Sequence, residues 1–305
     1  MPPSALLFPG QGSHADGMDE PYRGTPLFDR GLDLLGFDPF ERLAQGTRFQ
    51  QPALFLCSVA AWDAWRQGEG DADAAEVEPT DIVAAAGHSL GEYAALVAAG
   101  ALAFDDAVPL VAERGAAMDD AGREQPGGML AMLGGDALAV VALAERLGLT
   151  VANDNAPGQV VLSGPADAID RAEEAAKAET GARGRRLDVS GAFHSPLIAR
   201  AADRLRPAVD RVKFTEGASP FMSTVTAKIE DARRAGTLLI DQLTAPVKFT
   251  QAARELMRQG TTTFVEVGPG NVLSGLVKRI DRGVKTVSVN SLTALEKLEE
   301  TLGTA

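Results

Sequence analysis

Short runs of small and aliphatic residues alternate along this chain with segments whose apolar positions recur every three to four residues. The short runs predict buried strands, at 5–8, 82–86, 263–267 and 284–289. The periodic segments predict helices, at about 91–99, 105–120, 272–280 and 293–302. Gly100 is placed to end the first of these helices. Strands and helices that alternate in this way are typical of an α/β core around a mainly parallel sheet.

The middle of the chain has a different order of elements. Its strands are predicted at 128–133, 149–152, 159–163 and 185–190, and its helices at 136–147 and 166–180. A turn-rich segment, 153–158, separates the two central strands. The resulting β-α-β-β-α-β order is the ferredoxin-like arrangement. We therefore predict a small ferredoxin-like domain at 125–191, inserted into a large, hydrolase-like α/β domain formed by 1–124 and 192–305.

The composition is that of an ordinary globular protein, with 45% apolar and 23% charged residues among 305. Lys and Arg number 29 against 42 Asp and Glu, which gives a net charge of −13. Such an acidic surface repels phosphate backbones, so we expect no nucleic-acid partner. An anionic substrate then requires a local basic site. The acidic stretch 68–79 is predicted to be a solvated loop.

The sequence carries no signal for a membrane or for an oxidising compartment. The N-terminus lacks the basic region and long apolar core of a signal peptide, and the longest uncharged apolar run, 94–104, is too short to span a bilayer. The single cysteine, Cys57, excludes an intramolecular disulfide and a cysteine metal cluster, and its apolar neighbours predict a buried, inert thiol. We therefore expect a cytoplasmic protein.

The strongest chemical signal is the pentapeptide Gly87-His88-Ser89-Leu90-Gly91, which matches G-x-S-x-G. This pattern forms a tight strand-to-helix turn that lifts a serine hydroxyl clear of a sheet. A bare match is weak evidence, but here a strand of small residues precedes it and an uninterrupted helix follows it. Ser89 would lie at the positive end of that helix, where backbone N–H groups can stabilise an oxyanion. Ser89 is therefore the candidate nucleophile.

A serine nucleophile needs a base, and the chain contains three histidines. The ring of His88, adjacent to Ser89, should point away from the hydroxyl and be structural. His14 lies in a glycine-rich loop, where it is either near the site or simply an exposed polar residue. His194 follows an apolar approach and precedes a Ser-Pro turn, where the chain would leave the small domain. Because domain junctions favour sites, His194 is the base by elimination.

An arginine stands on an apolar helix face. Ala107, Val111, Arg114 and Met118 share one side of the predicted helix 105–120. An arginine in that position either extends its charge out to water or finds a partner inside. If Arg114 points into the Ser89 cleft, its planar guanidinium suits a substrate carboxylate. Both interpretations stay open on the residues alone.

With these residues in place, the chain resembles the malonyl-CoA:acyl carrier protein transacylases of fatty-acid synthesis from end to end. Eight motifs carry the resemblance in the family's order: FPGQGSH, QPALF, GHSLGEYAAL, Arg114-Gly115 with Met118, NDNAPGQVVLSG, SGAFHSPL, QLTAPVKF and EVGPGNVLSGL. The resemblance implies that Ser89 becomes malonylated and that His194 is its base. It also implies that Arg114 binds the malonyl carboxylate and that the backbone N–H groups of Gln11 and Leu90 form the oxyanion hole.

The same resemblance assigns roles to four further residues. Gln242 matches the residue whose backbone carbonyl orients the histidine. Asn153 and Asn155 match residues that line the cleft near the CoA arm. Phe193 matches the residue found in malonyl-selective rather than methylmalonyl-selective members.

Three positions depart from the family's usual pattern. His14 stands in place of glutamine, Gln50 in place of threonine, and Thr224 in place of asparagine. None of the three belongs to the Ser-His-Arg set, although His14 adds a titratable group near the mouth of the site.

The chemistry fits a Ser-His pair that lacks a carboxylate. The leaving group is a thiol, with a pKa of about 8.5, so it departs without the protonation that an amine needs. The resemblance implies two substrates, malonyl-CoA and the phosphopantetheine thiol of acyl carrier protein, ping-pong kinetics, and neither a metal nor another cofactor. It also implies a monomer.

Docking of an acidic carrier protein would use a local cationic patch. The candidate residues for this patch are Arg183, Arg185, Arg186, Lys278 and Arg279. The alternative is that these are scattered, solvated surface charges.

Two rival functions come from other classes, a serine thioesterase or esterase and a non-catalytic scaffold. Against the hydrolase, more than a third of the chain follows His194, whereas the usual α/β hydrolases carry their histidine much nearer the end. Against the scaffold, Ser89, His194 and Arg114 are all intact. A free-standing acyltransferase of a polyketide pathway shares the same chemistry and stays open, because the sequence alone does not separate the two; gene neighbourhood or the preference for a carrier protein would.

Overall fold

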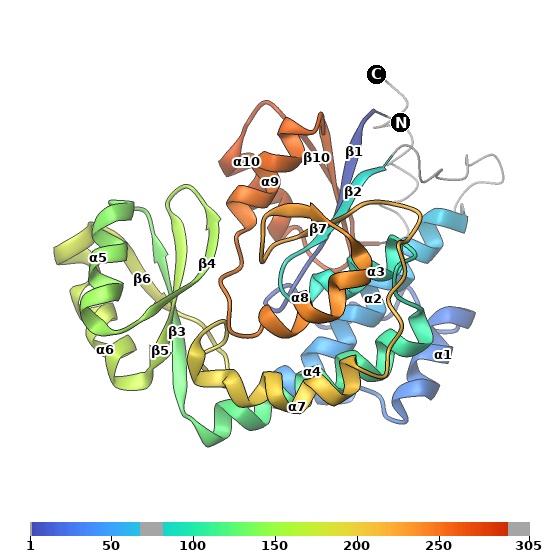
Figure 1. The fold of residues 1–305 in the computed structure, drawn as a ribbon, viewed down its shortest axis with the longest axis horizontal. Coiled ribbons are helices and arrows are strands. Elements are labelled where there is room, and N and C mark those ends of the chain that lie inside the picture. The colour runs from blue at the N-terminus through green and yellow to red at the C-terminus, as the bar shows by residue number, and fades with distance from the viewer. Residues whose placement is uncertain (1, 68–81, 292–305) are drawn as a thin grey trace.

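Six strands form the larger sheet of the computed structural model, which describes residues 2–67 and 82–291 (Figure 1). Their order is β10-β9-β1-β2-β7-β8, and every neighbouring pair is parallel except β7 with β8. The strands are β1 (Ser4–Phe8), β2 (Ile82–Gly87), β7 (Phe221–Ser223), β8 (Lys228–Glu230), β9 (Thr263–Val267) and β10 (Lys285–Val289). The predicted mainly parallel sheet is confirmed.

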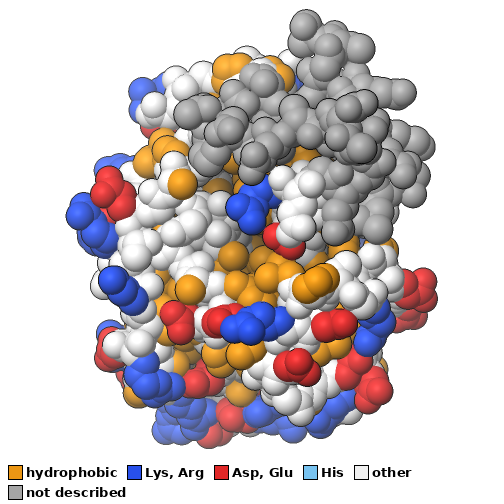
Figure 2. All heavy atoms as spheres, turned by 90° about the vertical axis from the view of Figure 1, so that its right-hand side faces the viewer, with side chains coloured by type: hydrophobic (Ala, Val, Ile, Leu, Met, Phe, Trp, Pro, Cys, Tyr) orange, Lys and Arg blue, Asp and Glu red, His pale blue; other side chains and the backbone are white. Residues whose placement is uncertain are grey.

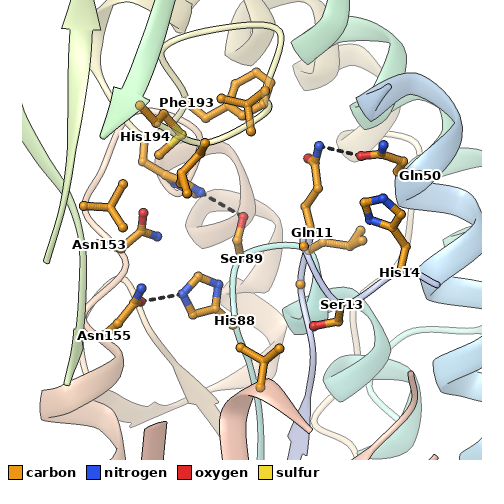
Figure 3. Close-up of a pocket in the computed structure, with 18 of the residues that line it drawn as sticks. Gln11, Ser13, His14, Gln50, His88, Ser89, Asn153, Asn155, Phe193 and His194 are labelled. Atoms are coloured by element: carbon orange, nitrogen blue, oxygen red, sulfur yellow. Dashed lines mark hydrogen bonds between the residues drawn. The ribbon is translucent and has the colours of Figure 1, made fainter. Parts of the chain in front are cut away.

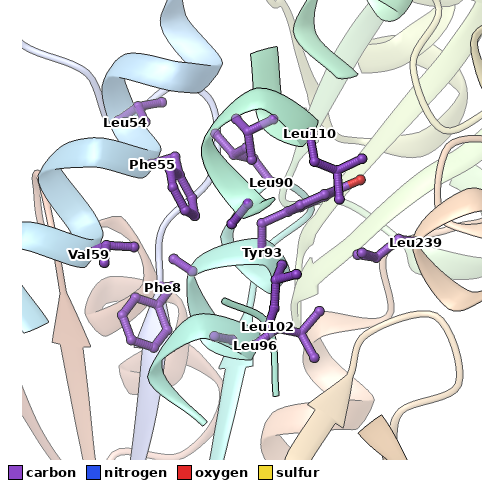
Figure 4. Close-up of a cluster of buried hydrophobic side chains, with 14 of the residues drawn as sticks. Phe8, Leu54, Phe55, Val59, Leu90, Tyr93, Leu96, Leu102, Leu110 and Leu239 are labelled. Carbon is purple, nitrogen blue, oxygen red and sulfur yellow. The ribbon is translucent and has the colours of Figure 1, made fainter. Parts of the chain in front are cut away.

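Helices cover both faces of this sheet. They are α1 (Pro26–Leu35), α2 (Thr47–Gln67), α3 (Gly91–Ala98), α4 (Phe104–Glu124), α7 (Ala199–Val209), α8 (Ala235–Asp241), α9 (Phe249–Arg258) and α10 (Val272–Ile280). Leu6 and Phe8 of β1 pack in the core shared with α2, α3 and α4 (Figure 4). Ala5 and Leu7 point the other way, into the core shared with α9 and α10. Because both faces are buried, β1 reads as one continuous apolar run.

The smaller sheet has four antiparallel strands in the order β4-β5-β3-β6. Its elements are β3 (Gly127–Leu133), α5 (Ala137–Leu147), β4 (Thr150–Ala156), β5 (Gln159–Pro165), α6 (Ala166–Ala175) and β6 (Arg183–Arg186). The Asp136 side chain accepts a hydrogen bond from the Ala139 N–H at 2.8 Å and begins α5, and Gly148, with φ of 68°, ends it. This order and topology confirm the ferredoxin-like arrangement.

The ends of β4 and β6 differ from the prediction, β6 begins at Arg183 rather than at 185, and the helix predicted at 166–180 is α-helical only to Ala175, followed by a π-helical turn. Strand β4 continues to Ala156, so the turn is confined to Pro157 and Gly158; bulges accommodate the extra residues of β4, and Asn153 also bridges to Val247.

Strand β6 ends at Arg186 rather than Ser190. Beyond it the chain leaves the sheet to pass against α4. There a Cβ on Gly122 would lie 2.5 Å from the Ser190 carbonyl oxygen, so the two backbones touch. Strands β7 and β8 were not predicted, because three residues are too few to show a pattern.

Several smaller predictions have clear outcomes. Cys57 is fully buried, and burial raises the pKa of its thiol well above the usual value. No helix within 2–67 and 82–291 has the length and apolar character needed to cross a membrane. The predicted loop at 68–79 and the predicted helix at 293–302 lie outside the described residues.

Candidate active site

A cavity of about 300 Å³ lies where the carboxyl ends of β1 and β2 face the smaller sheet (Figure 3). The segments after these strands, 10–14 and 88–90, form its floor and one wall. Met129, Val161 and their neighbours in the smaller sheet supply the opposite wall. The carboxyl edge of a parallel sheet is the usual place for a site in this architecture. The predicted site residues Ser89, His194, Arg114, Gln11, Leu90, Asn153, Asn155 and Phe193 all line this cavity.

Ser89 sits on a strained turn between β2 and α3. Its φ is 51°, a left-handed conformation that costs energy for a side-chain-bearing residue. The flanking glycines make the turn possible. A Cβ on Gly87 would lie 1.9 Å from the Gly91 backbone, and a Cβ on Gly91 would lie 2.0 Å from the Phe8 carbonyl oxygen. The spacing G-x-S-x-G therefore reflects the close crossing of three backbone segments.

His194 lies against the Ser89 hydroxyl. The Ser89 Oγ is 2.9 Å from His194 Nε2 (Figure 3). His194 Nδ1 is 2.8 Å from the backbone carbonyl oxygen of Gln242. Because a carbonyl only accepts, Nδ1 carries the proton and donates it to Gln242. Nε2 is then free to accept the Ser89 proton. His194 also has a positive φ, 57°, which shows that the loop holding the ring is strained as well.

Burial keeps the His194 imidazole neutral. Its loss of hydration, and secondarily the positive charge of Arg114, lower the pKa of His194 to about 3. The ring is therefore a neutral base at physiological pH.

We expect the His194 ring carbons to show no titration in an NMR experiment between pH 8 and pH 4, with His194→Gln assigning the signal. Because the unfolded chain binds this proton near 6.5 and the folded chain near 3, unfolding takes up a proton within that window. The free energy of unfolding should accordingly fall as the pH drops below 6.5, and fall less in the His194→Gln variant. A His194 signal that titrates near 6.5 would contradict the burial argument.

Arg114 is buried rather than extended to solvent, with 1% of its surface exposed. Its Nη2 donates to Ser89 Oγ at 3.0 Å and to Gln242 Oε1 at 2.9 Å, and its Nη1 donates to Gln51 Oε1 at 2.5 Å. Its Nε has no partner among the described residues, and no carboxylate there forms an ion pair with it. The structure thus holds a guanidinium with no directly paired carboxylate beside the candidate nucleophile.

Gln11 and Leu90 bring backbone N–H groups to the cavity. Within the described chain neither N–H donates a hydrogen bond, so both are available to an oxyanion. The Gln11 side chain is held in place: its Nε2 donates to Gln50 Oε1 at 2.8 Å, and Thr47 Oγ1 donates to its Oε1 at 2.6 Å. Gln50, one of the unusual residues, therefore supports the loop that carries Gln11.

Asn153 and Asn155 project from β4 into the cavity, and Phe193 lies beside the histidine (Figure 3). His88 also lines the cavity, where its Nε2 is 2.8 Å from Asn155 Oδ1. It forms no hydrogen bond with Ser89 in the described chain, in line with a structural role. Burial lowers the pKa of His88, so this ring is neutral too. His14 is exposed at the mouth of the cavity.

The five candidate docking residues fall into different environments. Arg183 and Arg185 are exposed on β6, opposite Leu133 and Ala131 of β3, and neither has an ion-pair partner among the described residues. Arg186, one residue on, pairs with Asp170 and Glu173 on the other side of the sheet.

The two candidates on α10 have polar partners. Lys278 donates to the Val284 carbonyl at 2.5 Å, and Arg279 donates to Gln159 Oε1 at 2.8 Å. Gln159 lines the cavity, so Arg279 lies near its rim. Figure 2 shows another face of the molecule, where Lys, Arg, Asp and Glu side chains are interspersed.

Two site residues were missed by the sequence analysis. Gln51 binds Arg114 directly, and Glu92 is a fully buried carboxylate one turn after Ser89. Burial raises the pKa of Glu92 to about 7, against the lowering effect of its hydrogen bonds and of Arg114. The signal for Glu92 was present: it is a carboxylate in the otherwise apolar segment GEYAALVA. Thr224, one of the unusual residues, donates to Glu92, so it is linked to the site.

Comparison with known proteins places this geometry in a family. Residues 32–300 match the acyl transferase domain family. The chain is 38% identical to the malonyl CoA-acyl carrier protein transacylase of Bacillus subtilis, over 98% of this chain and 96% of that one. It superposes on the crystal structure of the acyl-carrier-protein S-malonyltransferase from Bartonella henselae with a TM-score of 0.89, at 32% identity and over 99% and 100% of the two chains.

A third similarity concerns a complex. A malonyl-transacylase solved together with its holo acyl-carrier protein, of a type II polyketide synthase, matches with a TM-score of 0.88 and 34% identity, over 98% of this chain and 99% of that one. The chain is thus an acyltransferase of the acyl transferase family. Within that family it belongs with the malonyl CoA-acyl carrier protein transacylases.

Proposed function

We propose that this protein transfers a malonyl group from malonyl-CoA to the phosphopantetheine thiol of an acyl carrier protein, through a malonyl ester on Ser89. The observation that carries the proposal is Arg114, a buried cation without a carboxylate partner whose Nη2 lies 3.0 Å from the Ser89 Oγ. A malonyl group bound as a thioester presents a free carboxylate two bonds from the carbonyl that Ser89 attacks. The names of the relatives agree with this substrate.

Acylation follows from the hydrogen bonds of the site. Ser89 Oγ attacks the thioester carbonyl while its proton passes to His194 Nε2, and the N–H groups of Gln11 and Leu90 stabilise the tetrahedral oxyanion. Collapse breaks the C–S bond, and the His194 proton goes to the departing CoA sulfur. The second half-reaction is the reverse, with the carrier-protein thiol giving its proton to His194. Each cycle returns the enzyme to its starting protonation state.

The backbone carbonyl of Gln242 takes the place that an aspartate has in a catalytic triad. It holds the His194 tautomer without adding a negative charge. A thiolate leaves readily, so the imidazolium that forms needs less stabilisation than in amide hydrolysis. We propose that the reaction requires the two substrates and no metal or redox cofactor.

Intact-protein mass spectrometry tests the proposal. Malonyl-CoA should add one malonyl increment to the protein, and holo acyl carrier protein should then remove it and gain the same mass. Release of free CoA and malonate without transfer would instead favour the hydrolase alternative. Absence of both the adduct and free CoA would favour the scaffold.

The pathway of the carrier protein is a second question. The similarity to a transacylase in complex with a polyketide synthase carrier protein supports a polyketide role as the alternative to fatty-acid synthesis. The ratio of kcat/KM for a fatty-acid carrier protein to that for a polyketide carrier protein distinguishes the two.

We also propose that an acidic carrier protein docks on the cationic side of β6. Arg183 and Arg185 support this, because they are exposed, lack ion pairs in the described chain, and precede the cavity-lining residues 187–189. Charge reversal at both, Arg183→Glu with Arg185→Glu, should raise the KM for carrier protein about tenfold while the KM for malonyl-CoA is unchanged. Arg171→Glu, on α6 at the opposite face, is the matched control. Equal KM values for carrier protein in all three proteins would rule out this surface.

We also propose a division into two domains and a monomeric state. The two separate sheets support the division into a large domain, 1–124 with 192–305, and a small domain at 125–191. We propose that the protein acts as a monomer, since one chain supplies every group of the mechanism; light scattering measures the mass.

A further inference from the structure

We propose that Glu92 is a positioning residue for substrate recognition: it holds the Gln242 side chain in the one orientation that keeps Arg114 aimed at an acyl carboxylate. This inference rests on the proposed function. It concerns a carboxylate that takes no part in the proton transfers described above.

Gln242 is the junction between the two halves of the site. Its backbone carbonyl accepts from His194 Nδ1, as described above. Its side-chain Oε1 accepts from Arg114 Nη2 at 2.9 Å. Its side-chain Nε2 donates to Glu92 Oε2 at 2.7 Å and to the backbone carbonyl oxygen of Ser89 at 3.1 Å. The amide thus spans the distance between a buried cation and a buried carboxylate.

Glu92 is built to accept. It is 0% exposed, and its Oε1 accepts from the Thr224 N–H at 2.5 Å and from the Thr224 hydroxyl at 2.6 Å. Together with Gln242, three donors converge on this one carboxyl group. The ionised form, which predominates above its pKa of about 7, satisfies all three donors, because a carboxylate accepts and never donates. Glu92, held by Thr224, is therefore the partner that fixes the orientation of the Gln242 amide.

The orientation of the Gln242 amide follows from this arrangement. The two ends of an amide have nearly the same shape, so only their partners decide which end points where. Glu92 requires the NH₂ end, and Arg114, which has only donors, requires the oxygen end. A flipped amide would place NH₂ against the guanidinium and oxygen against the carboxylate. Both contacts would then be repulsive.

The Gln242 amide separates Glu92 from Arg114 and so leaves Arg114 available to a substrate carboxylate. Glu92 compensates the charge of Arg114 from the far side of an amide and forms no ion pair with it in the described chain. A direct Glu92–Arg114 pair would occupy the guanidinium and compete with a substrate carboxylate. Through the intervening amide, Arg114 gains an acceptor that fixes it in place while the guanidinium carries an unpaired positive charge at the cavity.

The variant Glu92→Gln tests this role. Its new amide presents NH₂ to Gln242 when its oxygen accepts from Thr224, so Gln242 should flip and turn its own NH₂ toward Arg114. We expect the single-turnover rate of Ser89 acylation by malonyl-CoA to fall about 10- to 100-fold. The rate with acetyl-CoA, which has no carboxylate for Arg114, should change less than about threefold. The malonyl-to-acetyl ratio is the readout, followed by intact mass.

Two controls separate positioning from general damage. Glu266→Gln also removes a fully buried carboxylate, one that accepts from the backbone of Leu273 and Ser274, but it does not touch Arg114. Its malonyl-to-acetyl ratio should match that of the wild-type protein. Thr224→Val keeps Glu92 and removes one donor to it, and should lower the ratio by about threefold; Thr224→Asn restores a donor and should restore the ratio.

The malonyl-to-acetyl ratios of the variants decide whether Glu92 positions Arg114. A ratio that falls in Glu92→Gln and Thr224→Val but not in Glu266→Gln supports the positioning role. Equal loss with both substrates in Glu92→Gln would show a merely structural carboxylate, and an unchanged ratio in both site variants would overturn the inference. If Glu92→Gln fails to fold, the Thr224 pair decides. If the wild-type protein forms no malonyl-Ser89, the proposed function fails. That result differs from an unchanged malonyl-to-acetyl ratio, which overturns only the positioning role of Glu92.

Discussion

Replacing Ser89 with alanine should abolish the malonyl adduct and lower kcat/KM for malonyl transfer by at least about 10⁴-fold. Among the described residues, the Ser89 Oγ is the cavity hydroxyl that contacts the base: it lies 2.9 Å from His194 Nε2 and 3.0 Å from Arg114 Nη2. Alanine removes that atom and leaves the cavity otherwise intact. Intact mass after mixing with malonyl-CoA measures the adduct, and a thiol assay measures the rate.

Ser163→Ala is a matched control for this variant. Ser163 is a fully buried serine of β5 whose hydroxyl has no hydrogen-bond partner among the described residues. It does not line the cavity. Its loss should leave the adduct and the rate as in the wild-type protein. A Ser89→Ala protein that still gains one malonyl increment would show that a different side chain is the nucleophile.

Replacing Arg114 with methionine should lower kcat/KM for malonyl-CoA by about 10²- to 10³-fold, the loss expected for one buried charge-assisted recognition contact. Methionine keeps an extended side chain in α4 but has neither charge nor donors. The rate of Ser89 acylation by acetyl-CoA should stay level or rise, because an acetyl group has no carboxylate to pair with Arg114. Acylation rates with the two thioesters, measured side by side, give the selectivity directly.

Arg123→Met controls for the loss of an arginine from the same helix. Arg123 lies at the exposed end of α4, where its Nε donates to Asp119 at 3.1 Å. The Arg123 side chain is 70% exposed, and the buried Asp119 carboxylate also accepts from Arg48 Nε, so Asp119 keeps a partner when Arg123 is replaced. Both activity and selectivity should therefore be retained. If Arg114→Met lowered the rates with malonyl-CoA and acetyl-CoA equally, Arg114 would serve the nucleophile or the fold rather than the substrate carboxylate.

Together with Glu92→Gln, these variants test the two sides of the site separately. Ser89 serves every acyl group, since each must pass through the same ester. Substitution of Arg114 or Glu92 should mainly affect acyl groups that carry a carboxylate. Because Gln242 holds His194 by its backbone and Arg114 by its side chain, substitutions that act through its amide should leave the base in place. The selectivity for malonyl over acetyl groups and the rate of acyl transfer through Ser89 should thus be separable by substitution.

Local patterns were sufficient to predict most of the elements that surround the site. Three of the four predicted strands of the large sheet, β1, β2 and β9, are buried almost throughout, so their apolar residues were informative; β10 is mostly half-buried. Helix α10 has the predicted bounds, and α5 begins and ends at its expected caps. No prediction was made for five helices of the large sheet, α1, α2, α7, α8 and α9. Predictions also failed at short or polar stretches: β7 and β8, the end of β4 at 153–156, and the end of β6. There, pairing with distant segments decides the conformation.

The sequence by itself determined the nucleophile turn, because its geometry depends on residues within a few positions of Ser89 and on two glycines that admit close backbone contact. Only the tertiary structure decided the rest. It buried Arg114 instead of letting the side chain reach water, placed the Gln242 carbonyl 2.8 Å from His194, and joined Glu92 to Thr224. The physical reason is that a polar group's partner and hydration are set by packing between distant segments, which no local pattern of hydrophobic positions encodes.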